Sequence, residues 1–342
     1  MDGLSITVMI VKVLIVFAGV MIGVMAMTLA ERRISAFMQD RLGPNRVGPK
    51  GILQPIADGI KFLMKEDIIP TAAVKPIYIL APAMLIIPAL MTFAVIPFGQ
   101  TITLFGKQIA LQVADVNIGI LYIFALTSVG VYGLVLAGWS SNSKYPLLGG
   151  LRSSAQLISY ELAMGLAAVS VIMMAGSLEL NDIVAAQQGE LFSWNICRQP
   201  LAFLIFLIAV YAETNRLPFD MTEAEQELVG GYHTEYSSMK FSMFFMAEYA
   251  NMITAAALTV TLFFGGWDIP LVNEVSLGFF GGILSVMAFA VKTAFFLFLF
   301  IWVRWTFPRF RYDQLMRLGW KVLLPLALLN IIITGAIMVL TA

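Results

Sequence analysis

Long apolar runs separated by short polar stretches follow one another along all 342 residues of the chain. A helix of about twenty residues crosses a hydrocarbon layer of about 30 Å, so we searched for apolar runs near that length. Eight candidate spans result, at residues 6–30, 77–96, 116–139, 155–176, 199–219, 241–264, 277–303 and 320–340. The pattern predicts an all-α polytopic membrane protein in which residues 1–342 form a single membrane domain.

The fifth of these spans is too short without polar residues. Its apolar part, residues 201–212, has twelve residues and would rise only about 18 Å as a helix. Completing the span places Glu213 inside the hydrocarbon layer, where an ionised carboxylate costs at least about 2.5 kcal/mol and is usually functional. The segment that follows has Arg216 as its only cation up to residue 236 and holds five further acids, Asp220, Glu223, Glu225, Glu227 and Glu235.

An amphipathic pattern lies in the loop between the first two spans. Polar residues recur there at helical spacing, at Gln54, Asp58, Lys61 and Lys65. Isoleucines and a leucine occupy another face of the same segment, at Ile52, Ile56, Ile60 and Leu63. We therefore expect an interfacial helix, which either anchors the loop or borders a polar cavity or a portal that faces lipid.

Basic residues concentrate in alternate loops. Eight Lys or Arg residues lie between the first two spans and five follow the seventh span, whereas the loops of the other parity carry only Lys107 and Arg198. Cytoplasmic loops are enriched in Lys and Arg, so this asymmetry places the odd-numbered loops in the cytoplasm. Both termini are then expected on the outer side of the membrane.

Three carboxylates fall at matched positions within consecutive spans. Counted from the predicted cytoplasmic ends, Glu161, Glu213 and Glu248 lie six or seven residues inside spans four, five and six, which is about 10 Å deep. Lys292 lies roughly halfway along span seven. Acids grouped at low dielectric have coupled proton affinities, so the pattern is typical of a proton relay. For any single member, a paired or snorkelling charge at a helix end is the alternative.

Composition limits the kinds of site that this chain can build. A single cysteine, Cys197, and a single histidine, His233, are too few for an iron–sulfur, haem or structural zinc site. Lys and Arg number 21 against 21 Asp and Glu, which gives no indication of nucleic-acid binding. Any redox cofactor must therefore be diffusible or held by a partner.

Three long motifs carry a resemblance to a known family. They are AERRISAFMQDRLGPNRVGPKGILQPIADGIKFLMKE at 30–66, SAQLISYELAMG at 154–165 and AETNRLPFDMTEAEQELVGGYHTEYSSMKFSMFFMAEY at 212–249. In these motifs the chain resembles the H subunit of bacterial NADH-quinone oxidoreductase, respiratory complex I, which is equivalent to mitochondrial NADH dehydrogenase subunit 1. Only Gln226 and His233 depart from the usual pattern.

The resemblance implies a membrane subunit of an H⁺-translocating NADH:quinone oxidoreductase. Together with two peripheral-arm subunits, such a subunit forms a quinone chamber entered from the bilayer between span one, the amphipathic helix and span six. The quinone, ubiquinone or menaquinone, is the substrate. Since the redox centres belong to partners, no catalytic residue, metal, flavin or iron–sulfur cluster is expected in this chain alone. Its surroundings would be small membrane subunits and lipid of the bacterial cytoplasmic membrane.

Two groups of residues match the family's functional positions. The resemblance assigns the quinone chamber and its portal to Glu31, Arg32, Arg41, Arg46, Asp58, Lys61, Arg216, Asp220, Glu223, Glu225 and Glu227. Glu161 and Glu248 match the start of the family's proton path. Glu213 and Lys292 join that path as further charges within the predicted spans.

Other classes of protein share parts of this pattern. The equivalent subunit of a membrane-bound hydrogenase-type complex has the same ancestry and spans, but the continuous ETNRLPFD and LGPNRVGPKG motifs favour complex I. A cation or proton secondary transporter should show repeated halves and broken helices at the midplane, and neither is clear in the sequence. A purely structural anchor would have no reason to bury acids at matched depths.

Overall fold

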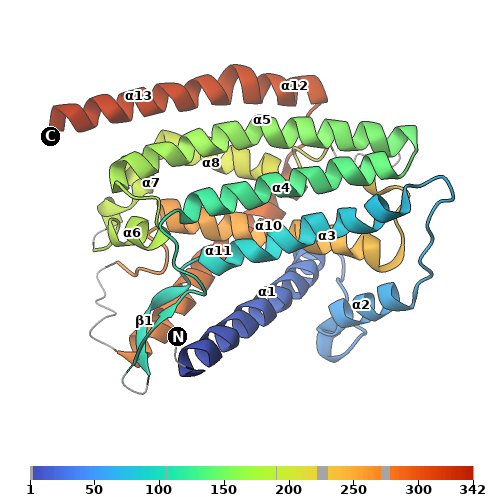
Figure 1. Cartoon of the computed structure of the whole chain (residues 1–342), viewed down its shortest axis with the longest axis horizontal. Coiled ribbons are helices and arrows are strands. Elements are labelled where there is room, and N and C mark those ends of the chain that lie inside the picture. The colour runs from blue at the N-terminus through green and yellow to red at the C-terminus, as the bar shows by residue number, and fades with distance from the viewer. Residues whose placement is uncertain (1–2, 105–106, 190, 222–229, 271–277, 342) are drawn as a thin grey trace.

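The protein is an elongated bundle of long helices (Figure 1). The computed structural model describes residues 3–104, 107–189, 191–221, 230–270 and 278–341. Within these residues, seven helices are long and apolar enough to cross a bilayer, and α8 is a shorter apolar helix. The prediction of a polytopic helical membrane protein is confirmed, with seven full-length spans and an eighth that is short.

The long helices follow the chain in order. They are α1 (Gly3–Met38), α3 (Lys75–Met91) with its 3₁₀ extension η2 (Thr92–Val95), α4 (Gly119–Ser140), α5 (Lys144–Ala175), α10 (Ser238–Phe263) and α11 (Phe279–Thr306). The last span is composite, made of α12 (Tyr312–Leu318), the π-helical turn η6 (Gly319–Leu323) and α13 (Leu324–Thr341). The short apolar helix α8 is Pro200–Glu213.

Short elements connect the spans. The amphipathic helix α2 (Gln54–Met64) confirms the interfacial helix predicted between the first two spans. The others are η1 (Pro49–Gly51), α6 (Leu180–Ala185), η3 (Leu191–Ser193), α7 (Asn195–Arg198) and η4 (Gly231–His233). An antiparallel hairpin of β1 (Gly99–Leu104) and β2 (Lys107–Leu111), which the hydropathy pattern did not predict, joins η2 to α4.

The bundle has two distinct ends. Both termini lie at the end that carries the hairpin, α6 and α7, and α2 lies toward the opposite end (Figure 1). We call these the terminal end and the loop end. The Ser238 hydroxyl, at the start of α10, donates to the carbonyls of Phe62 and Lys65 at 2.9 and 2.8 Å and so holds α10 against α2 at the loop end.

The centre of the bundle is packed with small and aromatic side chains. Ala163 and Ala209 are fully buried, as are Tyr160, Phe206 and Phe263. By contrast, α1 lies at the periphery, and most of its apolar side chains are exposed. Water disfavours such a large apolar surface, so this face is suited to lipid.

Two helix boundaries differ from the predicted spans. Helix α5 begins at Lys144 rather than at residue 155, because Pro146 falls in its first turn, where no intrahelical N–H bond is lost. Glu161 therefore lies near the middle of a 32-residue helix. The expectation that Glu161 lies about six residues into its span is wrong.

The fifth predicted span ends early. Helix α8 stops at Glu213, not at residue 219. Asn215 adopts a left-handed conformation with φ of 50°, which asparagine tolerates better than most residues. Pro218 in turn disfavours a helical conformation for Leu217. Glu213 is consequently the last residue of a 14-residue helix, with a non-helical segment directly after it.

Candidate functional site

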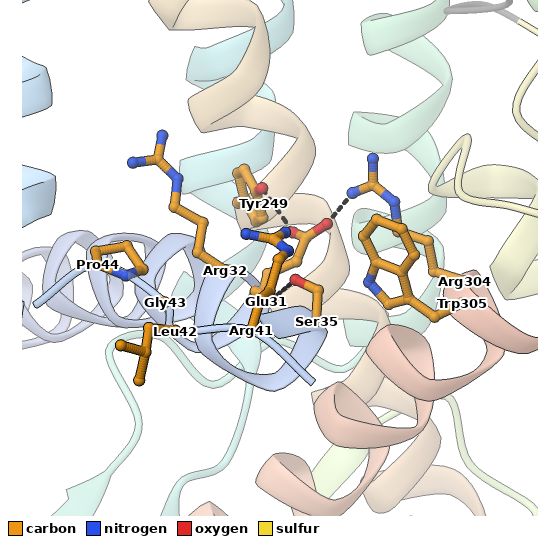
Figure 2. Close-up of a pocket in the computed structure, with 10 residues that line it drawn as sticks. All are labelled: Glu31, Arg32, Ser35, Arg41, Leu42, Gly43, Pro44, Tyr249, Arg304 and Trp305. Carbon is orange, nitrogen blue, oxygen red and sulfur yellow. Dashed lines mark hydrogen bonds and ion pairs between the residues drawn. The ribbon is translucent and has the colours of Figure 1, made fainter. Parts of the chain in front are cut away.

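A charged cavity opens beside the loop-end half of α1. Its volume is about 540 Å³. Figure 2 shows its lining side chains, which come from α1, the loop after it, α10 and α11. They are Glu31, Arg32, Ser35, Arg41, Leu42, Gly43, Pro44, Tyr249, Arg304 and Trp305. We refer to this space as the charged cavity.

Glu31 lies at the centre of the charged cavity and is buried. The Tyr249 hydroxyl donates to its Oε2 at 2.7 Å, and the Arg304 guanidinium donates to its Oε1 (Figure 2). A second guanidinium, that of Arg216, lies 3.4 Å from the same Oε1. A buried carboxylate is tolerated when it is paired and hydrogen-bonded, and these partners meet that condition.

Arg216 connects this carboxylate to a second one on α10. Its side chain is 6% exposed, and its Nε lies 3.7 Å from Glu248 Oε1. The guanidinium also lies over the Tyr249 ring, 4.6 Å from the ring centroid. Tyr249 and Glu248 are neighbours on α10, so a single arginine after α8 contacts both. The two acids Glu31 and Glu248 thus share one buried cation.

A small cavity joins Glu248 to Glu213. Its volume is about 30 Å³, and the side chains of Thr127, Asn215 and Asn251 line it together with the two acids. A second space of about 20 Å³ extends along Glu213 toward Thr254. A cavity needs about 10–15 Å³ on this measure to hold one water molecule, and it needs polar partners on its walls. Both conditions are met between the two carboxylates.

The row of acids ends at Glu161. The Ser128 hydroxyl on α4 donates to Glu161 Oε1, and the carboxylates of Glu161 and Glu213 repel each other electrostatically. Glu213 Oε2 is buried without a hydrogen-bond partner in the described part of the chain. Neither acid makes an ion pair with any described residue. We call Glu31, Glu248, Glu213 and Glu161 the carboxylate row.

An apolar groove adjoins the charged cavity. It has a volume of about 580 Å³ and runs between α1, α2 and α10. Arg32 and Tyr249 line both this groove and the charged cavity. On the α2 side, Asp58 pairs with Arg32 at 2.6 Å and lies 3.7 Å from Lys61. We call this space the portal groove.

The remaining predicted chamber residues are more dispersed. Arg41 lines the charged cavity, whereas Arg46 is exposed and makes no ion pair with the described residues. Asp220 is buried and pairs with Arg309 at 2.8 Å. The three acids Glu223, Glu225 and Glu227 lie outside the residues that the structure describes.

The structure does not bring Lys292 to the carboxylate row. Its amine donates to three backbone carbonyls just beyond the C-terminal end of α10, those of Phe264, Gly266 and Asp268, at 2.6–3.0 Å. It also lies 4.5 Å from the Trp194 ring centroid. Phe264 follows Glu248 by sixteen residues, or about 24 Å along a helix. A cation at a helix C-terminus complements the unpaired carbonyls there.

Three contributors to the site were not singled out from the sequence. Arg304 and Arg309 were counted only as basic residues after span seven, yet they pair with Glu31 and Asp220. Tyr249 looked like an ordinary aromatic residue beside Glu248. Arg304 belongs to the last turn of α11, and an arginine directly at the end of an apolar span was the signal that could have drawn attention to it.

His233 is buried next to this region but carries no charge at neutral pH. Its ring packs against those of Tyr232, Phe241 and Phe245, and burial lowers the pKa of the imidazole to about 4. Removing the ring from water disfavours its charged form. Among the described residues, no three of His, Cys, Asp and Glu gather in a way that could hold a metal ion.

Comparison with known proteins decides the family. The family model described as NADH dehydrogenase matches residues 11–335, nearly the whole chain. The chain belongs to the NADH dehydrogenase family. As a member of this family with several long apolar helices, it is a multi-pass membrane protein.

Relatives of this NADH dehydrogenase family member agree over most of their length. It is 54% identical over 310 residues to NADH-quinone oxidoreductase H subunit 1 of Cytophaga hutchinsonii, covering 90% of each chain. It is 56% identical over 324 residues to H subunit 2 of the Geobacter sulfurreducens enzyme, covering 95% of this chain and 94% of the relative. It is 55% identical over 313 residues to subunit 8 of the Rhodothermus marinus enzyme, covering 89% of each. The resemblance inferred from the motifs is confirmed.

Proposed function

We propose that this chain is the H subunit of a bacterial NADH-quinone oxidoreductase, in which it forms much of the quinone chamber and couples quinone reduction to proton translocation. The enzyme activity belongs to the assembled complex, whose other subunits hold the redox centres. The observation that carries the proposal is geometric. A charged cavity shares two side chains with an apolar groove and leads into a row of four buried acids.

The proposed substrate is a membrane quinone, ubiquinone or menaquinone. The portal groove would hold its isoprenoid tail, because its walls are mostly apolar side chains of α1, α2 and α10. Pockets for such ligands combine apolar walls with a few polar groups that fix orientation. Arg32 and Tyr249 supply those groups where the groove meets the charged cavity. Asp58 and Lys61 would then border the entrance.

The proposed coupling starts with the charge change when a quinone accepts electrons and protons. In a poorly hydrated chamber, charges interact over longer distances than in water. Glu31 is the acid at the centre of the charged cavity, and Arg216 links it to Glu248. From Glu248 the small cavity leads to Glu213 and then to Glu161. A change in the occupancy of one acid would alter the proton affinity of the next.

Several predicted residues take different places in this proposal. Arg216 and Arg41 belong to the chamber wall, and Asp220 would stabilise the segment after α8 through Arg309. The roles proposed for Arg46 and for the acids Glu223, Glu225 and Glu227 rest on the family motif alone. The proposed proton path does not include Lys292, because backbone carbonyls at the terminal end hold its amine.

The proposed surroundings follow from the same assignment. Two quinone-site subunits of the peripheral arm would cover the loop end, and small membrane subunits would lie beside the bundle. We propose the bacterial cytoplasmic membrane as its location, with both termini on the periplasmic side. The basic residues of the first loop and of the segment after α11 support that orientation. All 342 residues would form one membrane domain.

Filling the portal groove tests the proposal. Gly59 lines the groove, and a Cβ at this position would meet nothing within 4 Å, so Gly59→Leu fits the fold while occupying the space. The assembled complex should then show a raised KM for quinone and weaker labelling of α1 and α10 by a photoreactive quinone. Gly165→Leu is the control, since Gly165 also has open space and lies on α5 away from the groove. Unchanged KM and labelling in Gly59→Leu would contradict the proposed portal.

A further inference from the structure

A second apolar groove lies near the terminal end of α1. Its volume is about 600 Å³, and its walls come from α1, the β1–β2 hairpin, α10 and α11. Along α1 it extends from Thr7 to Gly23, a rise of about 24 Å. One leaflet of the hydrocarbon layer is about 15 Å deep, half of the full thickness. The groove is therefore long enough for an acyl chain to follow it across one leaflet.

A single charge marks this groove. Lys12 is the one charged side chain among the described residues that line it, and no carboxylate does so. The amine donates to the Gln112 carbonyl at 3.1 Å. A lysine ammonium has three donors, and that bond is its only hydrogen bond with the described residues. An occupant that matches the groove combines an apolar tail with an anionic head.

The wall of the groove leaves room for such a tail. Gly19 lines it, and a Cβ there would meet nothing within 4 Å. On the same helix Ile15 and Val11 line the groove and are also 65% and 47% exposed, so the groove is open toward the outer surface of α1. Because this surface is apolar, acyl chains of the bilayer would reach the groove directly.

We propose that this groove binds one anionic phospholipid from the leaflet at the terminal end, with its phosphate against Lys12 and an acyl chain along Gly19 and Gly23. The proposal concerns a different space from the portal groove, which lies between α1 and α2. A quinone has a neutral head and gains nothing from Lys12. A transmembrane helix of another subunit is the rival occupant, and it would need an acid opposite Lys12.

Photolabelling of the assembled complex in proteoliposomes tests the proposal. The probes are phosphatidylglycerol and phosphatidylcholine that carry the same diazirine in one acyl chain. In the unaltered complex, phosphatidylglycerol should label the segment around Gly19 more strongly than phosphatidylcholine does. Lys12→Gln should reduce that labelling about fivefold, the effect expected for one lysine near an anionic lipid head. Lys12→Arg keeps the charge and should keep the labelling.

A second pair of variants tests the tail. Gly19→Leu should abolish labelling by either lipid because it fills the groove, whereas the smaller Gly19→Ala should retain it. Equal labelling by the two lipids in the unaltered complex, or no change in Lys12→Gln, would overturn the proposal. Cross-links from this segment to another subunit in place of lipid would also overturn it. If Gly19→Leu does not assemble, the Lys12 pair alone decides. Lipid labelling is measured independently of quinone reduction, so failure here leaves the proposed function standing.

Discussion

The two ends of the carboxylate row solve the problem of a buried acid in opposite ways. Glu31 is held by Arg216, Arg304 and Tyr249, and Arg216 also contacts Glu248. Glu213 and Glu161 have no cation in contact among the described residues, and Ser128 supplies the hydrogen bond to Glu161. The first pair is neutralised by fixed charges. The second pair relies on shared protons or water instead.

This difference separates structure from proposed chemistry. A compensated acid resists a change of protonation, since losing its charge would strand the arginines that hold it. An acid without a cation gains or loses a proton without breaking such a network. The structure therefore divides the carboxylate row into a rigid part at the charged cavity and a responsive part deeper in the bundle.

Removing Arg216 should have the largest effect on stability. In Arg216→Gln, Glu31 and Glu248 lose their shared cation, which we expect to cost about 3–5 kcal/mol, as breaking a buried ion pair does. The thermal unfolding midpoint and the yield of assembled complex should both fall. Arg311→Gln is the matched control, because its pair with Asp313 is mostly exposed and is worth at most about 1 kcal/mol. Equal losses in the two variants would remove the distinction between the buried and exposed pairs.

His233 tests a third solution, in which a buried group stays neutral. Its folded pKa of about 4 lies below the ordinary value of 6.5. Between these values the unfolded chain binds a proton that the folded chain does not, so stability is full above about pH 6.5 and falls as the pH drops toward 4, by at most about 3 kcal/mol. His233→Phe should lose that component of the pH dependence in denaturation measured from about pH 4 to 8. An identical pH profile in both proteins would contradict this account.

Asp58 should show the smallest effect on stability. Its pair with Arg32 is partly exposed, so Asp58→Asn should change the free energy of unfolding by at most about 1 kcal/mol. Because Asp58 lines the portal groove, the KM for quinone should rise instead. Asp67→Asn breaks a comparable pair with Lys240 that does not line the groove, and its KM should stay unchanged. A large loss of stability with no change in KM would reverse our assignment of Asp58.

The sequence predicted the spans because a bilayer demands long apolar runs, and it predicted α2 because its two faces differ in polarity. It did not predict where α8 ends, since Asn215 and Pro218 act through backbone conformation rather than hydropathy. Nor could it pair Arg304 with Glu31, which lie 273 positions apart and meet only through the packing of α1 against α11. Glu161 was grouped correctly with Glu213 but by a wrong count of depth.

Glu213→Gln in fully assembled complex is the most direct test of the proposed coupling. NADH-to-quinone electron transfer and the proton gradient would be followed together in sealed membranes, with Asp313→Asn, an exposed acid, as the control. Since Glu213 makes no ion pair with the described residues, the variant should assemble normally. Our account predicts loss of the proton gradient with slower electron transfer. Unaltered rates of both processes would contradict it and leave Glu213 with a structural role.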